Sequence, residues 1–153
     1  MSKAFTKEDD AGQKSGLPDR AISPHPNLVT AEGLAQIEAA IAKLAEEQAR
    51  ARVAGDATAG VSAARDLRYW SARRATAQLT VPKPSSQVQF GSRVSIKRAD
   101  GSTRAYRIVG TDEGDPARGT LSYASPLAQA LMGKEIGDTV VVGAREEEIV
   151  GVA

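Results

Sequence analysis

The sequence contains no cysteine and a single histidine, His25, among its 153 residues. The absence of cysteine excludes disulfides and thiolate metal sites, and one histidine is too few for a histidine-based metal centre. Aromatic residues make up only 4% of the chain, which excludes a thick aromatic core and favours a thin, helix-rich or two-part architecture. Twenty Lys and Arg against 19 Asp and Glu leave a net charge of +1. Such a balance argues against a protein that binds nucleic acid mainly by neutralising phosphates.

Long hydrophobic runs are also missing. No apolar stretch approaches the length of a membrane span, and the N-terminus lacks the apolar core of a signal peptide. We therefore expect a soluble, cytoplasmic protein with no metal ion or cofactor of its own.

Residues 1–27 contain three prolines and two glycines among balanced charges, with only scattered apolar residues. Such a segment buries too little apolar surface to order itself, so we predict a disordered tail over residues 1–27. The alternative is a docking peptide that folds on a partner.

Residues 28–81 have the pattern of an antiparallel helical hairpin. Thr30 and Glu32 favour a helix start, as an N-cap and a first-turn acid. A narrow apolar seam follows at spacings of three and four, formed by Leu34, Ile37, Ile41, Leu44, Gln48 and Ala51. A turn is expected over residues 54–60. A second helix is expected from about Val61 to Leu79, with Leu67, Trp70, Ala77 and Leu79 as its main apolar positions, before Pro82 and Pro84.

Residues 82–153 change to the period of two that is typical of strands. Short strands are expected around residues 94–96, 105–110, 120–123, 139–142 and 148–152, with Asp100-Gly101 as a hairpin turn. Ser125 and Pro126 are a typical helix start, and Gly133 ends that short helix. The whole chain is therefore predicted to be α+β, with the hairpin followed by a small antiparallel sheet domain.

Several of these short motifs, taken in order, resemble the bacterial GreA/GreB transcript-cleavage factors over residues 28–153. In the first half they are Asn27-Leu28-Val29-Thr30 with Gly33, and the turn Gly55-Asp56. The second half adds Phe90-Gly91, Arg107-Ile108-Val109-Gly110 with Asp112-Glu113, Ser125-Pro126-Leu127-Ala128 with Ala130-Leu131, and Gly137-Asp138.

The resemblance implies an FKBP-like C-terminal domain that docks on bacterial RNA polymerase, and a hairpin that enters the secondary channel of the polymerase. The docking residues that it implies are Ala124, Ser125, Pro126 and Leu127. In the family, acidic residues at the hairpin tip help to hold a catalytic Mg²⁺ in the polymerase's own active centre, where backtracked RNA is cleaved. The protein itself would be a monomeric accessory factor rather than an enzyme, and it would contact nascent RNA only indirectly.

The expected hairpin tip departs from the family pattern. Asp56 is the tip candidate, but Ala59 stands where the family has a second acid, and Gly60 stands where it has Asn. The nearest other acids, Glu47 and Asp66, lie nine and ten residues from Asp56, which along a helix corresponds to about 15 Å. The first helix is also about two turns shorter than the family would have. Cleavage stimulation by this chain is therefore an open question.

Three functional alternatives follow. The first is a Gre-like elongation factor that stimulates cleavage, and the second is a non-cleaving regulator that competes with true Gre factors for the channel. The third is a prolyl isomerase of the FKBP type, which needs an aromatic-lined pocket. Only Phe90, Tyr106 and Tyr123 are available to line one.

The second helix carries four arginines, Arg65, Arg68, Arg73 and Arg74. They are interpreted either as a solvated face or as a surface for RNA or polymerase acids.

Overall fold

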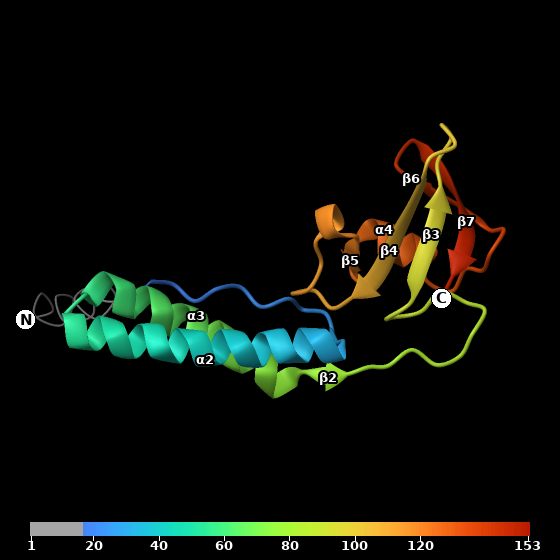
Figure 1. Cartoon of the computed structure of the whole chain (residues 1–153). Coiled ribbons are helices and arrows are strands. Elements are labelled where there is room, and N and C mark those ends of the chain that lie inside the picture. The colour runs from blue at the N-terminus through green and yellow to red at the C-terminus, as the bar shows by residue number, and fades with distance from the viewer. Residues whose placement is uncertain (1–16) are drawn as a thin grey trace, which may run out of the picture. The chain divides into compact units, whose positions relative to one another are not determined.

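The computed structural model of the protein describes residues 17–153. Contacts divide the chain into two compact units (Figure 1). The helical unit contains the described residues 17–22 and residues 37–75, and the sheet unit contains residues 23–36 and 76–153. This division differs from the predicted boundaries at 27/28 and 81/82, because residues 23–36 make their contacts with the sheet.

Two long helices precede a strand-rich region, so the predicted α+β layout is confirmed. The long helices are α2 (Ala31–Ala54) and α3 (Ala57–Thr76), and the short ones are η1 (Pro116–Arg118) and α4 (Pro126–Leu131). The strands are β1 (Leu28–Val29), β2 (Gln78–Leu79), β3 (Arg93–Lys97), β4 (Thr103–Val109), β5 (Thr120–Ser122), β6 (Thr139–Val142) and β7 (Arg145–Val152). None of the helices within residues 17–153 is long and apolar enough to cross a membrane.

The turn between α2 and α3 is shorter than predicted. It consists of Gly55, with a φ of 69°, and Asp56, and α3 begins at Ala57. Asp56 starts the helix because its Oδ1 accepts a hydrogen bond from the Ala59 backbone N–H at 3.0 Å, the arrangement of an N-cap. Gly60 therefore lies inside α3 rather than in the turn.

The second helix also ends earlier than predicted, at Thr76. Gln78 and Leu79 leave the helix and form β2, which pairs in parallel with Leu28 and Val29 of β1. Leu79 was expected to pack in the seam, but it is 55% exposed. Pairing with a strand 50 residues away thus decides the conformation of a stretch whose local pattern favours a helix.

The predicted seam of α2 is confirmed, since all six of its residues are buried or half-buried. Ile37 and Ala51 are the most deeply buried of them, and Ala63 of α3 is buried as well. Outside the seam, α2 carries the exposed pairs Lys43–Glu47 and Glu46–Arg50 at the i,i+4 spacing.

Residues 17–22, the N-terminal segment, lie on α3 without forming a helix or strand. Asp19 pairs with Arg68 at 2.7 Å, and Arg20 pairs with Asp66 at 3.3 Å. The predicted tail over 1–27 thus differs from the structure over its described part, while residues 1–16 lie outside the described residues. Exposed ion pairs contribute on the order of 1 kcal/mol or less. Ordering one residue costs roughly 1–2 kcal/mol, so these two ion pairs do not by themselves hold the N-terminal segment in place.

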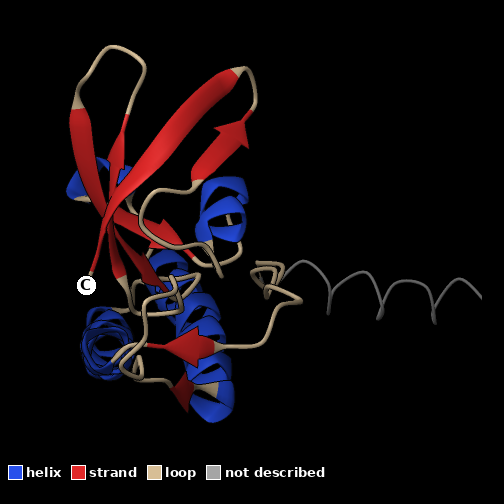
Figure 2. Cartoon of the chain, turned by 90° about the vertical axis from the view of Figure 1, so that its right-hand side faces the viewer, coloured by secondary structure: helices blue, strands red, loops and turns tan. Residues whose placement is uncertain are grey.

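The sheet unit is built on a five-stranded sheet with the strand order β5-β4-β3-β7-β6. Its pairs are antiparallel except for β4 and β5, which run in parallel because η1 lies in the connection between them. The predicted antiparallel sheet is confirmed for three of its four strand pairs, and the pair at this edge is parallel. The short helix α4 packs against the sheet through the fully buried Ala128 and Leu131 (Figure 2).

The core of the sheet unit joins the inward side chains of the strands to α4. It contains Val88, Phe90, Val94, Ile96, Tyr106, Ile108, Leu121, Tyr123, Ala128, Leu131, Val140 and Ile149. On β3, Val94 and Ile96 are fully buried, while Arg93 and Lys97 are exposed, as strand alternation requires. The sheet therefore has one packed face, and α4 with its preceding loop is fixed on it.

The N-cap of α3 generates the first prediction. Replacing Asp56 with Ala should lower the free energy of unfolding of the hairpin by about 1 kcal/mol, because the Ala59 N–H loses its acceptor. Asp56→Ser is the matched control, since serine is an equally good N-cap without a carboxylate. Urea denaturation followed by helix ellipticity measures both variants. Equal stability of Asp56→Ala and the wild type would contradict the capping role.

Candidate functional site

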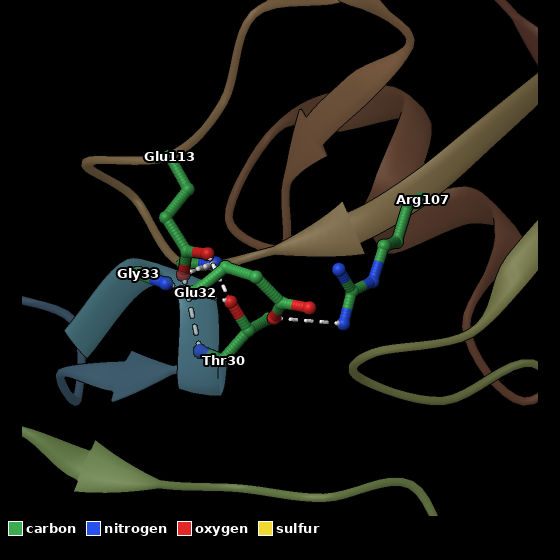
Figure 3. Close-up of polar contacts among 6 residues, drawn as sticks. Thr30, Glu32, Gly33, Arg107 and Glu113 are labelled. Atoms are coloured by element: carbon green, nitrogen blue, oxygen red, sulfur yellow. Dashed lines mark hydrogen bonds and ion pairs between the residues drawn. The ribbon is translucent and has the colours of Figure 1, made fainter. Parts of the chain in front are cut away.

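A group of polar contacts that spans the sequence of the sheet unit surrounds the start of α2 (Figure 3). Thr30 directly precedes the helix, and its Oγ1 accepts a hydrogen bond from the Gly33 backbone N–H at 3.0 Å. Thr30 is therefore the N-cap that the sequence predicts. A capping box would place Glu or Gln at the third helical position, where its carboxyl would accept from the N–H of the N-cap residue. Here that position is Gly33, which has no side chain.

Glu113 supplies the missing carboxylate from 83 residues further along the chain. Its Oε2 accepts from the Thr30 backbone N–H at 3.2 Å and from the Gly110 backbone N–H at 3.0 Å. The Thr30 hydroxyl donates to Oε1 of the same carboxylate. The result is a capping box completed by a distant residue, and Figure 3 shows the Glu113 side chain extended toward Thr30 and Gly33.

The two glycines are required by this close approach. A Cβ at Gly33 would overlap the Glu113 carboxylate. A Cβ at Gly110 would lie 2.5 Å from the Leu28 carbonyl oxygen and 2.7 Å from Oε2 of Glu113. Thr30, Gly33, Gly110 and Glu113 therefore form one unit, the latch, which holds the first turn of α2 on the loop that follows β4.

Neighbouring contacts support the latch. Arg107 of β4 donates from Nη2 to Oε2 of Glu32 at 3.3 Å. Hydrogen bonding by its own backbone N–H, followed by the hydrogen bond from Arg107, holds the pKa of Glu32 below its ordinary value. Glu32 is therefore ionised at neutral pH. The stabilisation by its ion pair with Arg107 is lost as the pH falls through that lowered pKa. Asn27 Nδ2 also donates to Thr76 Oγ1 at 3.2 Å.

The latch is a structural site rather than a catalytic one. The Glu113 carboxylate accepts three hydrogen bonds from Thr30 and Gly110, so both of its oxygens are engaged in holding the helix start. Sequence reasoning identified Thr30 as an N-cap, but it identified Gly33, Gly110 and Glu113 only as parts of a motif. The available signal was the incomplete capping box Thr-x-x-Gly, which leaves the N–H of the N-cap residue open to an acceptor from elsewhere in the chain.

The predicted docking residues 124–127 form the rigid entry to α4. Ser125 is the N-cap, and its Oγ accepts from the Ala128 N–H at 3.3 Å. The Ala124 N–H donates to Ser122 Oγ at 3.2 Å, and Leu127 packs against the core. Pro126 occupies the first turn and is exposed. The structure thus brings these four residues together as one surface loop that presents Pro126 to solvent.

The hairpin-tip candidate Asp56 is exposed, and its carboxylate serves as the N-cap of α3. The two nearest acids are engaged elsewhere: Glu47 pairs with Lys43 at 3.9 Å, and Asp66 pairs with Arg20 at 3.3 Å. Within residues 17–153, no three acidic, histidine or cysteine side chains are grouped so that they could hold a metal ion.

The arginines of α3 have partners within the chain. Arg65 pairs with Asp66, Arg68 with Asp19 and Arg74 with Glu38, while Arg73 is almost fully buried. Their contacts favour a salt-bridged face over an open basic patch for RNA.

The aromatic side chains required by the isomerase alternative are part of the hydrophobic core. Phe90, Tyr106 and Tyr123 are each buried, and Phe90 packs edge-on against Tyr123 with ring centroids 5.7 Å apart. Because these rings fill the core, they are not available to line the pocket that the isomerase alternative needs.

The latch generates the second prediction. Gly33→Ala should destabilise the protein by about 1 kcal/mol, because the new methyl displaces Glu113 and leaves the Thr30 N–H without its acceptor. In a Glu113→Ala background the same substitution should instead stabilise by about 0.5–1 kcal/mol, because alanine favours a helix over glycine. Urea denaturation of the four proteins gives both differences.

Gly60→Ala is the matched control for this cycle, since a Cβ there meets only Ala51 Cβ at 3.7 Å. It should stabilise both backgrounds alike. The same sign for Gly33→Ala with and without Glu113 would contradict the latch.

Comparison with known proteins agrees with this architecture. A sequence model of the domain described as "Transcription elongation factor, GreA/GreB, C-term" matches residues 83–152. Transcription elongation factor GreA of Desulfovibrio desulfuricans is 34% identical over 149 residues, covering 82% of this chain and 92% of that protein. Transcription elongation factor GreB of Xanthomonas axonopodis pv. citri is 35% identical over 137 residues, covering 88% of this chain and 78% of that protein.

Among solved structures, the chain is similar to the GreA factor homolog 1 (Gfh1) of Thermus thermophilus, with a sequence identity of 16% and a TM-score of 0.42. The match covers 84% of this chain and 99% of that chain. Family membership rests on the sequence relatives, which exceed 30% identity over most of both chains, and on the matched C-terminal domain. The chain belongs to the GreA/GreB family of transcription elongation factors.

Proposed function

We propose that this protein is an accessory factor that docks on bacterial RNA polymerase at the secondary channel and regulates elongation. Its relatives GreA and GreB are named transcription elongation factors, which supports a polymerase partner. The observation that carries the proposal is the geometry of loop 124–127, where a capped helix start fixes an exposed proline in place. A preorganised loop loses little conformational entropy on binding, which suits a small docking surface.

A second part of the proposal concerns the hairpin. We propose that it occupies the channel without stimulating RNA cleavage, so that the protein competes with true cleavage factors. A Mg²⁺ ion shared with the polymerase would need several oxygen ligands, and the hairpin tip offers only the carboxylate of Asp56. That carboxylate already accepts a hydrogen bond from the Ala59 N–H. Glu47 and Asp66 are held in ion pairs of their own. The Mg²⁺ and any cleavage chemistry would belong to the polymerase.

The alternative is the ordinary cleavage-stimulating mechanism. It requires that Asp56 turn from its capping position toward the metal, and that a second carboxylate come from outside the tip. Asp56 is exposed and its N-cap bond is a single contact, so the first requirement is physically accessible. The second has no candidate close to Asp56 in the sequence, which favours the non-cleaving role.

The docking loop generates the third prediction. Pro126→Asp should weaken binding to core RNA polymerase by roughly 2 kcal/mol, or about 30-fold, because it introduces an unpaired charge into a small interface. Aspartate is well tolerated in the first turn of a helix, so the fold should be kept. Pro116→Asp is the matched control, because Pro116 also opens a short helix and is exposed. Affinity is measured by titrating labelled protein with polymerase. Equal affinity of the two variants would overturn the docking assignment.

The hairpin tip generates the fourth prediction. At saturating concentration the wild type should not shorten RNA in backtracked polymerase complexes, and it should inhibit shortening by a true Gre factor. Asp56→Ser should inhibit equally, because it keeps the N-cap of α3 and removes only the carboxylate. Robust shortening that disappears in Asp56→Ser would overturn the non-cleaving role and restore the ordinary Gre mechanism.

A further inference from the structure

The middle of α3 receives an arginine from the chain's own N-terminal segment. The Arg20 guanidinium lies 3.9 Å from the centroid of the Tyr69 ring and 5.8 Å from that of Trp70. Its Nη1 also donates to Asp66 Oδ1 at 3.3 Å. The Tyr69 and Trp70 rings are nearly perpendicular, with centroids 5.1 Å apart. One cation is thus bound by a carboxylate and two aromatic rings at once.

This surface has the chemistry of an arginine-binding site. A planar guanidinium can stack on an aromatic face while its edge donates to a carboxylate, and lysine cannot do both. Beside it, Arg68 Nε donates to Asp19 Oδ1 at 2.7 Å. The surface therefore binds an acidic residue and the arginine that follows it, through complementary charges of α3.

The side chains of Asp19 and Arg20 attach the N-terminal segment to α3. No backbone hydrogen bond joins residues 17–22 to another residue in the described part of the chain. Its two largest apolar residues, Leu17 and Ile22, are 44% and 52% exposed and add little packing. A second chain that carries the same two side chains can make the same contacts with α3.

We propose that Asp66, Arg68, Tyr69 and Trp70 form a binding site for a protein segment that carries an acidic residue followed by arginine. Asp19 and Arg20 are its intramolecular occupant. Being tethered to the same chain, they compete at a high effective concentration, so an external segment binds well only when it is multivalent or when the N-terminal segment is removed. The site is separate from the docking loop 124–127 and does not depend on the proposed function.

Trp70, the single tryptophan of the chain, provides a direct readout of this site. The probe is a synthetic peptide with the sequence of residues 17–22, titrated into the full-length chain while tryptophan fluorescence is recorded. The Asp19→Ala/Arg20→Ala double variant should bind the peptide roughly tenfold or more tightly than the wild type, because its own occupant is gone. The same peptide with lysine in place of arginine should bind that variant about fivefold more weakly.

Two further variants make the outcome decisive. Lys43→Ala/Glu47→Ala removes an exposed ion pair elsewhere on the hairpin and should bind the peptide like the wild type. Adding Asp66→Asn to the Asp19→Ala/Arg20→Ala variant should abolish saturable binding while helix ellipticity is retained. Equal peptide affinity for the wild type and the Asp19→Ala/Arg20→Ala variant, or no saturable binding to that variant, would overturn the proposal. Equal binding of the lysine peptide would overturn its arginine specificity.

Discussion

The carboxylate of Glu113 is the contact on which the attachment of the first turn of α2 within the sheet unit depends. It satisfies the Thr30 N–H that a local capping box would otherwise satisfy, and it binds Gly110 of its own loop at the same time. Because helix-start donors left unpaired in a part-buried position are costly, the latch stabilises the sheet unit and the first turn of α2 together. The absence of a side chain at Gly33 and Gly110 follows directly from this contact. Arg107 and Glu32 add an ion pair beside it, and the pairing of β1 with β2 joins the segment before α2 to the segment after α3.

Much of the fold follows from local sequence patterns. The seam of α2, the alternation of β3 and the Ser125-Pro126 helix start were predictable, because each depends on neighbours within a few residues. The conformation of Gln78 and Leu79 was not, because β1 supplies their partners from 50 residues away. The parallel position of β5 beside β4 depends on the η1 connection, which has no strong periodicity. The role of Glu113 was likewise beyond local reasoning, since Thr30 and Glu113 are 83 residues apart.

The sequence explains more of the structure at loop 124–127 than at the hairpin tip around Asp56. For loop 124–127 the N-cap and the first-turn proline explain both the rigidity of the loop and the exposure of Pro126. For the tip, the sequence showed that Asp56 lacked a partner acid, and the structure adds that its carboxylate caps α3. The Arg20 site on α3 was missed because a Pro-containing, low-hydrophobicity segment indicates disorder, while ion pairs and ring stacking leave no periodic signal. The same contacts account for Asp66 and Arg68, which the helix pattern alone would assign to a solvated face.

The distance along the chain between Thr30 and Glu113 also sets an order of events during synthesis. Both helices are synthesised before residue 113 has been added, so the first turn of α2 is made before its acceptor. Domains fold largely as units in the order in which they are made. The free end of the hairpin, with its own cap at Asp56, can therefore form first, while the base of the hairpin becomes fixed only after the loop following β4 has emerged. In the growing protein, the first turn of α2 is therefore the last part of that helix to become stably folded.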